Sequence, residues 1–84
     1  MKITVRLFAS YREIVGQTRL DVEVPEGATA GDLLRMFVER YPRLGDLAGG
    51  TLLAVNRDYA GAETQLRESD EVAFVPPVSG GAGG

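Results

Sequence analysis

The chain has 84 residues, 44% of them hydrophobic and 25% charged, which suits one small globular domain. Its 9 basic and 12 acidic side chains give a net charge of −3, and the basic residues are scattered, which argues against nucleic acid and membranes as partners. Cysteine and histidine are absent from the sequence, which excludes disulfides, thiol nucleophiles and metal sites of thiolate or imidazole. An autonomous enzyme is therefore not expected.

The first predicted element is a strand over residues 2–8. Its residues alternate in polarity, so Ile3, Val5 and Leu7 share a buried face while Phe8 points the other way. The start of the chain has no apolar stretch typical of a signal peptide, so we expect a cytoplasmic protein.

Three further segments follow in order. Residues 9–15 fit one or two helical turns, with Gly16 as their stop. Residues 19–24 alternate again and predict a second strand, antiparallel to the first. Pro25-Glu26-Gly27 is a turn.

The strongest helix signal begins at Thr29, a suitable N-cap, with Asp32 three residues later as the acid of a capping box. The helix should end before Pro42, because a residue that precedes proline is disfavoured in helical conformation. One apolar stripe recurs at helical spacing: Leu33, Leu34, Phe37, Val38 and Tyr41. The helix should therefore lie with one face on a sheet.

The second half of the chain predicts mostly strands. Residues 43–50 are expected to be loop because of their glycines, and residues 51–56 form a nearly all-apolar strand suited to a central position covered on both sides. A minor strand is expected near residues 63–65. A polar turn at 67–70 then leads into the last strand, 71–75.

This order of elements predicts an α+β, ubiquitin-like β-grasp fold, with a mixed four- to five-stranded sheet and one main helix packed across one face. We assign the β-grasp domain to residues 1–78 and a flexible glycine-rich carboxyl-terminal tail to residues 79–84. Such a tail is either a frayed end or a thread that carries the terminal carboxylate into a narrow site on a partner.

The first and last strands are neighbours in this fold, so Phe8, Ala73 and Val75 are expected together on the open face of the sheet, with Tyr59 nearby. Such an apolar group predicts a docking patch. The alternative is that Phe8 turns back into the core and Tyr59 packs locally. Three charged residues could frame the patch or simply be solvated: Arg6, Arg12 and Glu13.

Three stretches carry a resemblance to a known family: FASYRE at 8–13, LAVN at 53–56 and DEVAFVPPVSGG at 70–81. They closely resemble the small subunit of molybdopterin synthase, a MoaD-like sulfur carrier of the ubiquitin-like β-grasp family with ThiS-like relatives. The likeness covers nearly the whole chain. The final stretch is the most specific of the three.

The resemblance implies a sulfur carrier. An E1-like, MoeB-like adenylyltransferase would use ATP to adenylate the carboxyl-terminal glycine, and sulfur from a donor would then replace AMP. The thiocarboxylate would give its sulfur to cyclic pyranopterin monophosphate in the MoaE-like large subunit of molybdopterin synthase. No cofactor would be bound stably, and the partner would supply the catalytic side chains.

The resemblance also implies site residues. The catalytic carboxylate would be that of Gly84, the terminus as written, or of Gly81, where the family usually ends. The three extra residues add roughly 10 Å of reach, so the tail buckles, is trimmed, or fits partners matched to its length. The other site residues are the tail positions Gly80, Gly81, Ala82 and Gly83, and the partner-binding positions Phe8, Tyr59, Ala73, Val75 and Pro76.

Other functions remain open. The same carrier chemistry would serve thiamin synthesis or tRNA thiolation, or conjugation to lysines as a ubiquitin-like protein modifier. A non-catalytic β-grasp interaction module with an inert tail belongs to a different class. Loss of function on deletion of residues 80–84 would separate a carrier from such a module.

Overall fold

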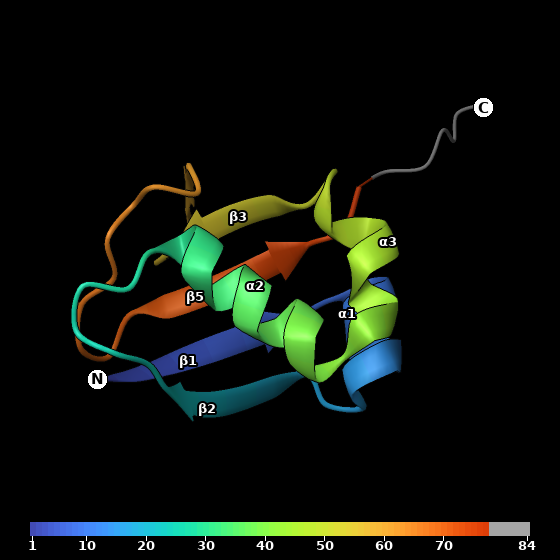
Figure 1. Ribbon diagram of the computed structural model, residues 1–84, viewed down its shortest axis with the longest axis horizontal. Coiled ribbons are helices and arrows are strands. Elements are labelled where there is room, and N and C mark those ends of the chain that lie inside the picture. Colours follow the sequence, from blue (N-terminus) through green and yellow to red (C-terminus); the bar gives the residue numbers. More distant parts are fainter. Residues whose placement is uncertain (78–84) are drawn as a thin grey trace.

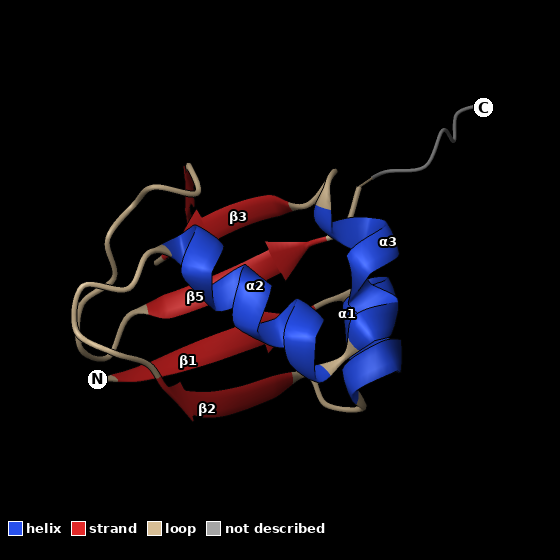
Figure 2. Cartoon of the chain, in the orientation of Figure 1, coloured by secondary structure: helices blue, strands red, loops and turns tan. Residues whose placement is uncertain are grey.

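The computed structural model describes residues 1–77, which form a five-stranded sheet with one main helix, α2, across one face (Figure 1, Figure 2). The elements in chain order are β1 (Lys2–Leu7), α1 (Ala9–Val15), β2 (Arg19–Glu23), α2 (Ala30–Arg40), the 3-10 helix η1 (Pro42–Leu44), α3 (Gly45–Ala48), β3 (Leu52–Val55), β4 (Asp58–Ala60) and β5 (Glu71–Val75). The strand order is β2-β1-β5-β3-β4, with β1 and β5 parallel and the other pairs antiparallel. The predicted β-grasp fold is confirmed.

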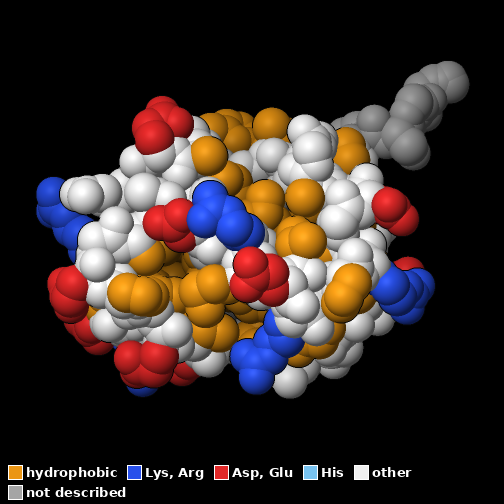
Figure 3. All heavy atoms as spheres, viewed as in Figure 1, with side chains coloured by type: hydrophobic (Ala, Val, Ile, Leu, Met, Phe, Trp, Pro, Cys, Tyr) orange, Lys and Arg blue, Asp and Glu red, His pale blue; other side chains and the backbone are white. Residues whose placement is uncertain are grey.

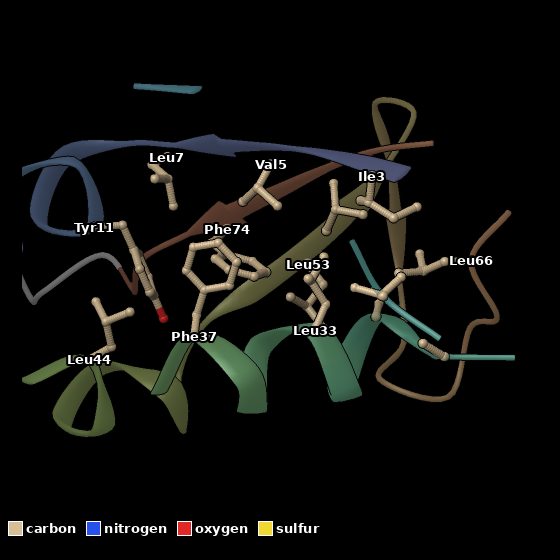
Figure 4. Close-up of a cluster of buried hydrophobic side chains, with 14 residues drawn as sticks. Ile3, Val5, Leu7, Tyr11, Leu33, Phe37, Leu44, Leu53, Leu66 and Phe74 are labelled. Atoms are coloured by element: carbon tan, nitrogen blue, oxygen red, sulfur yellow. The ribbon is translucent and has the colours of Figure 1, made fainter. Parts of the chain in front are cut away.

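Hydrophobic side chains fill the space between the sheet and α2 (Figure 4). Ile3, Val5 and Leu7 of β1 are buried there, as their alternation predicts. Phe74 of β5 lies opposite Leu7, and its ring packs edge-on against that of Phe37 from α2, with ring centroids 5.2 Å apart. Such aromatic pairs stabilise a core beyond the area that they bury.

Both predicted helices are confirmed: α1 occupies residues 9–15, and α2 begins after its N-cap, Thr29. Gly16 ends α1 in the left-handed conformation, with φ of 89°, and its N–H donates to the carbonyl of Arg12 at 2.7 Å. At the start of α2, the Asp32 N–H donates to the Thr29 hydroxyl at 3.1 Å, and the Thr29 N–H donates to the Asp32 carboxylate at 3.0 Å. This reciprocal pair is a capping box.

The loop predicted for residues 43–50 is wrong over residues 43–48, because η1 and α3 occupy residues 42–48. Pro42 stands at the first position of η1, where its missing N–H costs no hydrogen bond. Leu44 is fully buried and anchors this segment to the core. Gly45 adopts ordinary right-handed helical angles, so its presence did not indicate a turn.

Where a minor strand was predicted near residues 63–65, the structure has only an isolated antiparallel bridge between Gln65 and Thr29. The additional strand is β4, which pairs with β3. A two-residue turn joins the two strands, with Val55 opposite Asp58 and with φ of 52° at Asn56 and 76° at Arg57. Two left-handed residues in succession are typical of a tight hairpin. The Asn-Gly pair that usually marks such a turn is absent here, so the sequence did not reveal the hairpin between β3 and β4.

Residues 61–66 instead cover the amino-terminal end of α2. The N–H of Ala30 donates to the carbonyl of Thr64, and that of Gly31 to the carbonyl of Ala62, each at 2.8 Å. These bonds satisfy donors that have no partner within the helix. A Cβ atom on Gly31 would lie 2.9 Å from the Cβ of Ala62, so glycine is needed for this close approach.

The strand predicted to be central, now β3, lies inside the sheet between β5 and β4. Leu53 and Ala54 are buried, but Leu52 is 49% exposed, so the predicted coverage on both sides is incomplete. Seen from the α2 side, basic and acidic side chains intermingle on the surface (Figure 3). Among residues 1–77, no helix combines the length and the apolar character that a membrane span requires.

Candidate docking surface and chain exit

The strand register places a row of four residues across the sheet. Arg6 of β1 lies opposite Ala73 of β5, Ala73 lies opposite Ala54 of β3, and Ala54 lies opposite Tyr59 of β4. Directly paired residues point to the same side of a sheet, and successive residues alternate. Since Phe74 faces α2, this row belongs to the other side, which no helix covers in Figure 1.

Around this row lies a shallow hollow of about 300 Å³, which we call the open-face hollow. Its lining residues are Arg6, Phe8, Ala54, Arg57, Tyr59, Glu71, Ala73 and Val75. Phe8 is 41% exposed and Tyr59 78% exposed, whereas Ala73 and Ala54, which lie between Arg6 and Tyr59 in the row, have minimal side chains. Large apolar side chains around small ones make a surface that can receive a complementary partner.

Charged groups border the apolar part of the open-face hollow. A guanidinium nitrogen of Arg6 lies 3.5 Å from a carboxylate oxygen of Glu71. The same guanidinium group lies over the ring of Phe8, with 5.7 Å between its central carbon and the ring centroid. Arg6 is therefore held between a carboxylate and an aromatic face, contacts that are each weak at an exposed site.

The structure brings together most of the predicted partner-binding residues. Phe8, Tyr59, Ala73 and Val75 all line the open-face hollow, so Phe8 does not turn back into the core. Pro76 follows Val75 and is half-buried, but it does not line the hollow. Of the three charged residues expected nearby, Arg6 lines the hollow, whereas Arg12 and Glu13 line a different one.

Sequence reasoning missed three lining residues: Ala54, Arg57 and Glu71. Ala54 and Glu71 could have been found from alternation along β3 and β5, because they share the parity of Ala73 once the strands are paired. Arg57 could not, because its place depends on the hairpin turn that the sequence did not reveal.

The end of β5 adjoins the loop before β3. Pro77 lies so close to Gly50 that a Cβ atom added to Gly50 would stand 3.1 Å from the Cβ of Pro77. The residue after Gly50 is Thr51, whose hydroxyl donates to the carbonyl of Leu47 at 2.8 Å. The buried hydroxyl of Tyr11 bonds to this Thr51 hydroxyl. The predicted tail positions Gly80, Gly81, Ala82 and Gly83, and the predicted terminus Gly84, lie outside the described residues.

Among residues 1–77, two groups have shifted pKa values, Tyr11 and Asp32, and neither lines the open-face hollow. Burial raises the pKa of Tyr11. The hydrogen bond from the Thr29 backbone, followed by smaller contributions that include Arg35, lowers the pKa of Asp32.

Comparisons with known proteins agree on one family. The ThiS family matches residues 5–81. The molybdopterin synthase sulfur carrier subunit of Mycobacterium tuberculosis is 40% identical over 82 residues, which cover 96% of this chain and 99% of that protein. The corresponding subunit of Arabidopsis thaliana is 35% identical, with coverage of 96% and 84%.

A solved structure extends the comparison. Small archaeal modifier protein 1 from Haloferax volcanii superimposes with a TM-score of 0.79 and is 29% identical, over 92% of this chain and 98% of that one. The likenesses in sequence and in fold thus cover the same domain. Because the family match spans residues 5–81 and the mycobacterial subunit is 40% identical over nearly the whole chain, this chain belongs to the ThiS family.

Proposed function

We propose that this protein is the sulfur carrier subunit of a molybdopterin synthase. The observation that carries the proposal is the 40% identity to the mycobacterial sulfur carrier subunit over 96% of this chain. The chain has no cysteine, so it offers no thiol that could hold a persulfide. The carboxyl-terminal glycine is therefore the position at which sulfur travels.

The proposed chemistry has three steps. A carboxylate is a poor electrophile, so an E1-like enzyme first joins it to AMP, with release of pyrophosphate from ATP. Sulfide-level sulfur (HS⁻) from a donor then attacks the acyl carbon and displaces AMP, which leaves a thiocarboxylate. In the large subunit, the thiocarboxylate passes its sulfur to cyclic pyranopterin monophosphate, and water restores the carboxylate.

The open-face hollow is the proposed binding site for both the large subunit and the E1-like enzyme. Phe8 and Val75 lie in it, and Val75 is two residues before Pro77, where the described chain ends. A protein bound there would stand next to the start of the tail. One surface would then direct the carboxyl terminus into the active site of whichever partner is bound, in the cytoplasm.

The deciding experiment is an intact mass measurement after incubation with an E1-like enzyme, ATP and a sulfur donor. We expect a gain equal to the exchange of one oxygen for sulfur on the 84-residue chain, which would assign the thiocarboxylate to Gly84. The same gain on a chain that ends at Gly81, but not on the longer one, would assign it to Gly81. No gain on either chain, with an E1-like enzyme active on another carrier, would refute the carrier function.

A second candidate is a ubiquitin-like protein modifier, favoured by the likeness to small archaeal modifier protein 1. The two functions differ in the final acceptor of the activated carboxyl group. A carrier leaves cells without molybdenum-dependent enzyme activity when its gene is deleted, whereas a modifier becomes attached to lysine side chains. Normal molybdenum-dependent growth of the deletion strain, together with such adducts, would favour the modifier.

A further inference from the structure

The turn between β3 and β4 contains an arginine in a conformation that arginine rarely adopts. Asn56 and Arg57 form its two central residues, with φ of 52° and 76°, and Val55 pairs with Asp58 on either side. Left-handed angles bring the Cβ atom of an L-residue close to the backbone, so glycine is preferred at the second position of such turns. Arg57 is thus a residue that the turn itself disfavours.

The first residue of the turn has a structural reason for its identity. The side-chain amide of Asn56 donates to a carboxylate oxygen of Asp70 at 2.9 Å, and its carbonyl oxygen accepts the N–H of Glu71 at 3.0 Å. Asparagine also tolerates the left-handed conformation better than most residues. Asn56 therefore ties the turn to the start of β5.

Arg57 has no comparable reason within the fold. Inside the described part of the chain, its side chain makes no hydrogen bond or ion pair, even though Asp58 is its neighbour in sequence. It nevertheless lines the open-face hollow together with Tyr59. Something other than the stability of residues 1–77 must account for an arginine at this position.

The charges of the open-face hollow indicate what Arg57 contacts. Three of its eight lining residues are charged, and Arg6 is already paired with Glu71 at 3.5 Å. Arg57 is thus an arginine of the hollow without a carboxylate partner among residues 1–77. A chain with a net charge of −3 therefore presents local positive charge beside its exposed aromatic side chains.

We propose that Arg57 is a specificity-determining residue, which pairs with a carboxylate on the large subunit that docks in the open-face hollow. The inference rests on the proposed function, because it assigns a charge requirement to the partners of that surface. A planar guanidinium group can donate two parallel hydrogen bonds to a carboxylate. Such a pair at the rim of an interface speeds association with acidic partners and disfavours basic ones.

Two substitutions test this pairing in the full chain. Arg57→Glu reverses the charge, and Arg57→Gly removes the side chain while it relieves the left-handed strain. The matched control is Arg43→Glu, which makes the same change at an exposed arginine outside the hollow and without an ion pair in the described region. Association rates and affinities for the large subunit are measured at low and high salt, beside thermal unfolding.

We expect Arg57→Glu to slow association about tenfold at low salt, with a smaller effect at high salt. Arg57→Gly should bind more weakly although its unfolding temperature does not fall, because glycine fits the turn. Arg43→Glu should bind like the unmodified chain. Binding of Arg57→Glu to the large subunit equal to that of Arg43→Glu would overturn this inference alone, whereas failure of the unmodified chain to bind the large subunit would overturn the proposed function as well.

Discussion

The hydroxyl group of Tyr11 donates its hydrogen bond to the hydroxyl group of Thr51. The direction follows from the next bond, since Thr51 has one hydroxyl proton and donates it to the carbonyl of Leu47 at 2.8 Å. Tyr11 is fully buried, and its ring lies 5.6 Å from that of Phe74. The bond joins α1 to the start of β3, next to the place where Pro77 contacts Gly50.

Tyr11 should make the protein less stable at alkaline pH. Burial raises its pKa above the ordinary value of 10.0, so above that pH the unfolded chain loses the tyrosine proton more readily than the folded chain. The stabilisation that protonated Tyr11 contributes is thus complete below pH 10 and is lost as pH rises through the pKa of Tyr11 in the folded chain. Urea unfolding of the unmodified chain and of Tyr11→Phe between pH 8 and pH 11 would show it, with the variant less sensitive to pH.

At neutral pH, Tyr11→Phe should lower the free energy of unfolding by about 1 kcal/mol, the usual contribution of one such hydrogen bond. The effect should come with little change in the core, because the ring stays in place. Equal pH profiles for the two proteins would contradict the raised pKa of Tyr11.

Gly50→Ala should disturb the position of Pro77. The added Cβ atom would lie 3.1 Å from the Cβ and 3.3 Å from the Cγ of Pro77, closer than ordinary contact, so the proline ring must move. The proposed sulfur transfer depends on accurate delivery of the carboxyl terminus, so its rate should fall, by about tenfold if the exit shifts by part of an ångström. Single-turnover transfer to the large subunit measures this rate.

The matched control for Gly50→Ala is the residue before it. A Cβ atom on Gly49 would meet nothing within 4 Å, and Gly49 has ordinary right-handed angles, so Gly49→Ala should transfer sulfur like the unmodified chain. Both variants should still bind the large subunit, because neither residue lines the open-face hollow. Equal transfer rates for the two variants would show that Pro77 does not set the exit.

The capping box of α2 should make stability sensitive to acid. The pKa of Asp32 is lowered chiefly by the hydrogen bond from the Thr29 backbone, so its carboxylate stabilises the fold above about pH 4 and loses that effect as pH falls through the folded pKa. Chemical unfolding at pH 7 and pH 3 should show that acid lowers the free energy of unfolding less for Asp32→Asn than for the unmodified chain. Glu39→Gln, on the same helix, is the control.

Thr29→Ala tests the other half of the capping box. It removes the hydroxyl that accepts the Asp32 N–H and should lower the free energy of unfolding by about 1 kcal/mol at pH 7. An unchanged stability would mean that the covering segment 61–66 alone holds the start of α2.

The open face could be anticipated in part because alternation along a strand is a strict geometric rule. Once β1 and β5 are neighbours, the burial of Leu7 and Phe74 places Phe8, Ala73 and Val75 on the far side. Helix caps are equally local, which explains why Thr29 was identified.

What escaped prediction depends on contacts distant in sequence or on unusual turn residues. Residues 42–48 are helical, and Leu44 in this segment is fully buried in the core. This tertiary contact outweighs the local preference of the glycines for a loop, so the sequence alone did not indicate it. Arg57 stands where Asn-Gly would mark a hairpin, so β4 and the place of Arg57 in the hollow went unrecognised. The choice between Gly81 and Gly84 stays a prediction, because both lie outside the described residues.

Tyr59→Ala should separate binding from folding. Tyr59 is 78% exposed, so its removal should change the free energy of unfolding by less than about 0.5 kcal/mol. Exposed tyrosines in a binding surface often contribute more than 1 kcal/mol each, so affinity for the large subunit should fall about tenfold or more. Met36→Ala, at an exposed apolar residue on α2, should leave the affinity unchanged. Calorimetric titration measures both, and equal affinities for the two variants would place the partner on another surface.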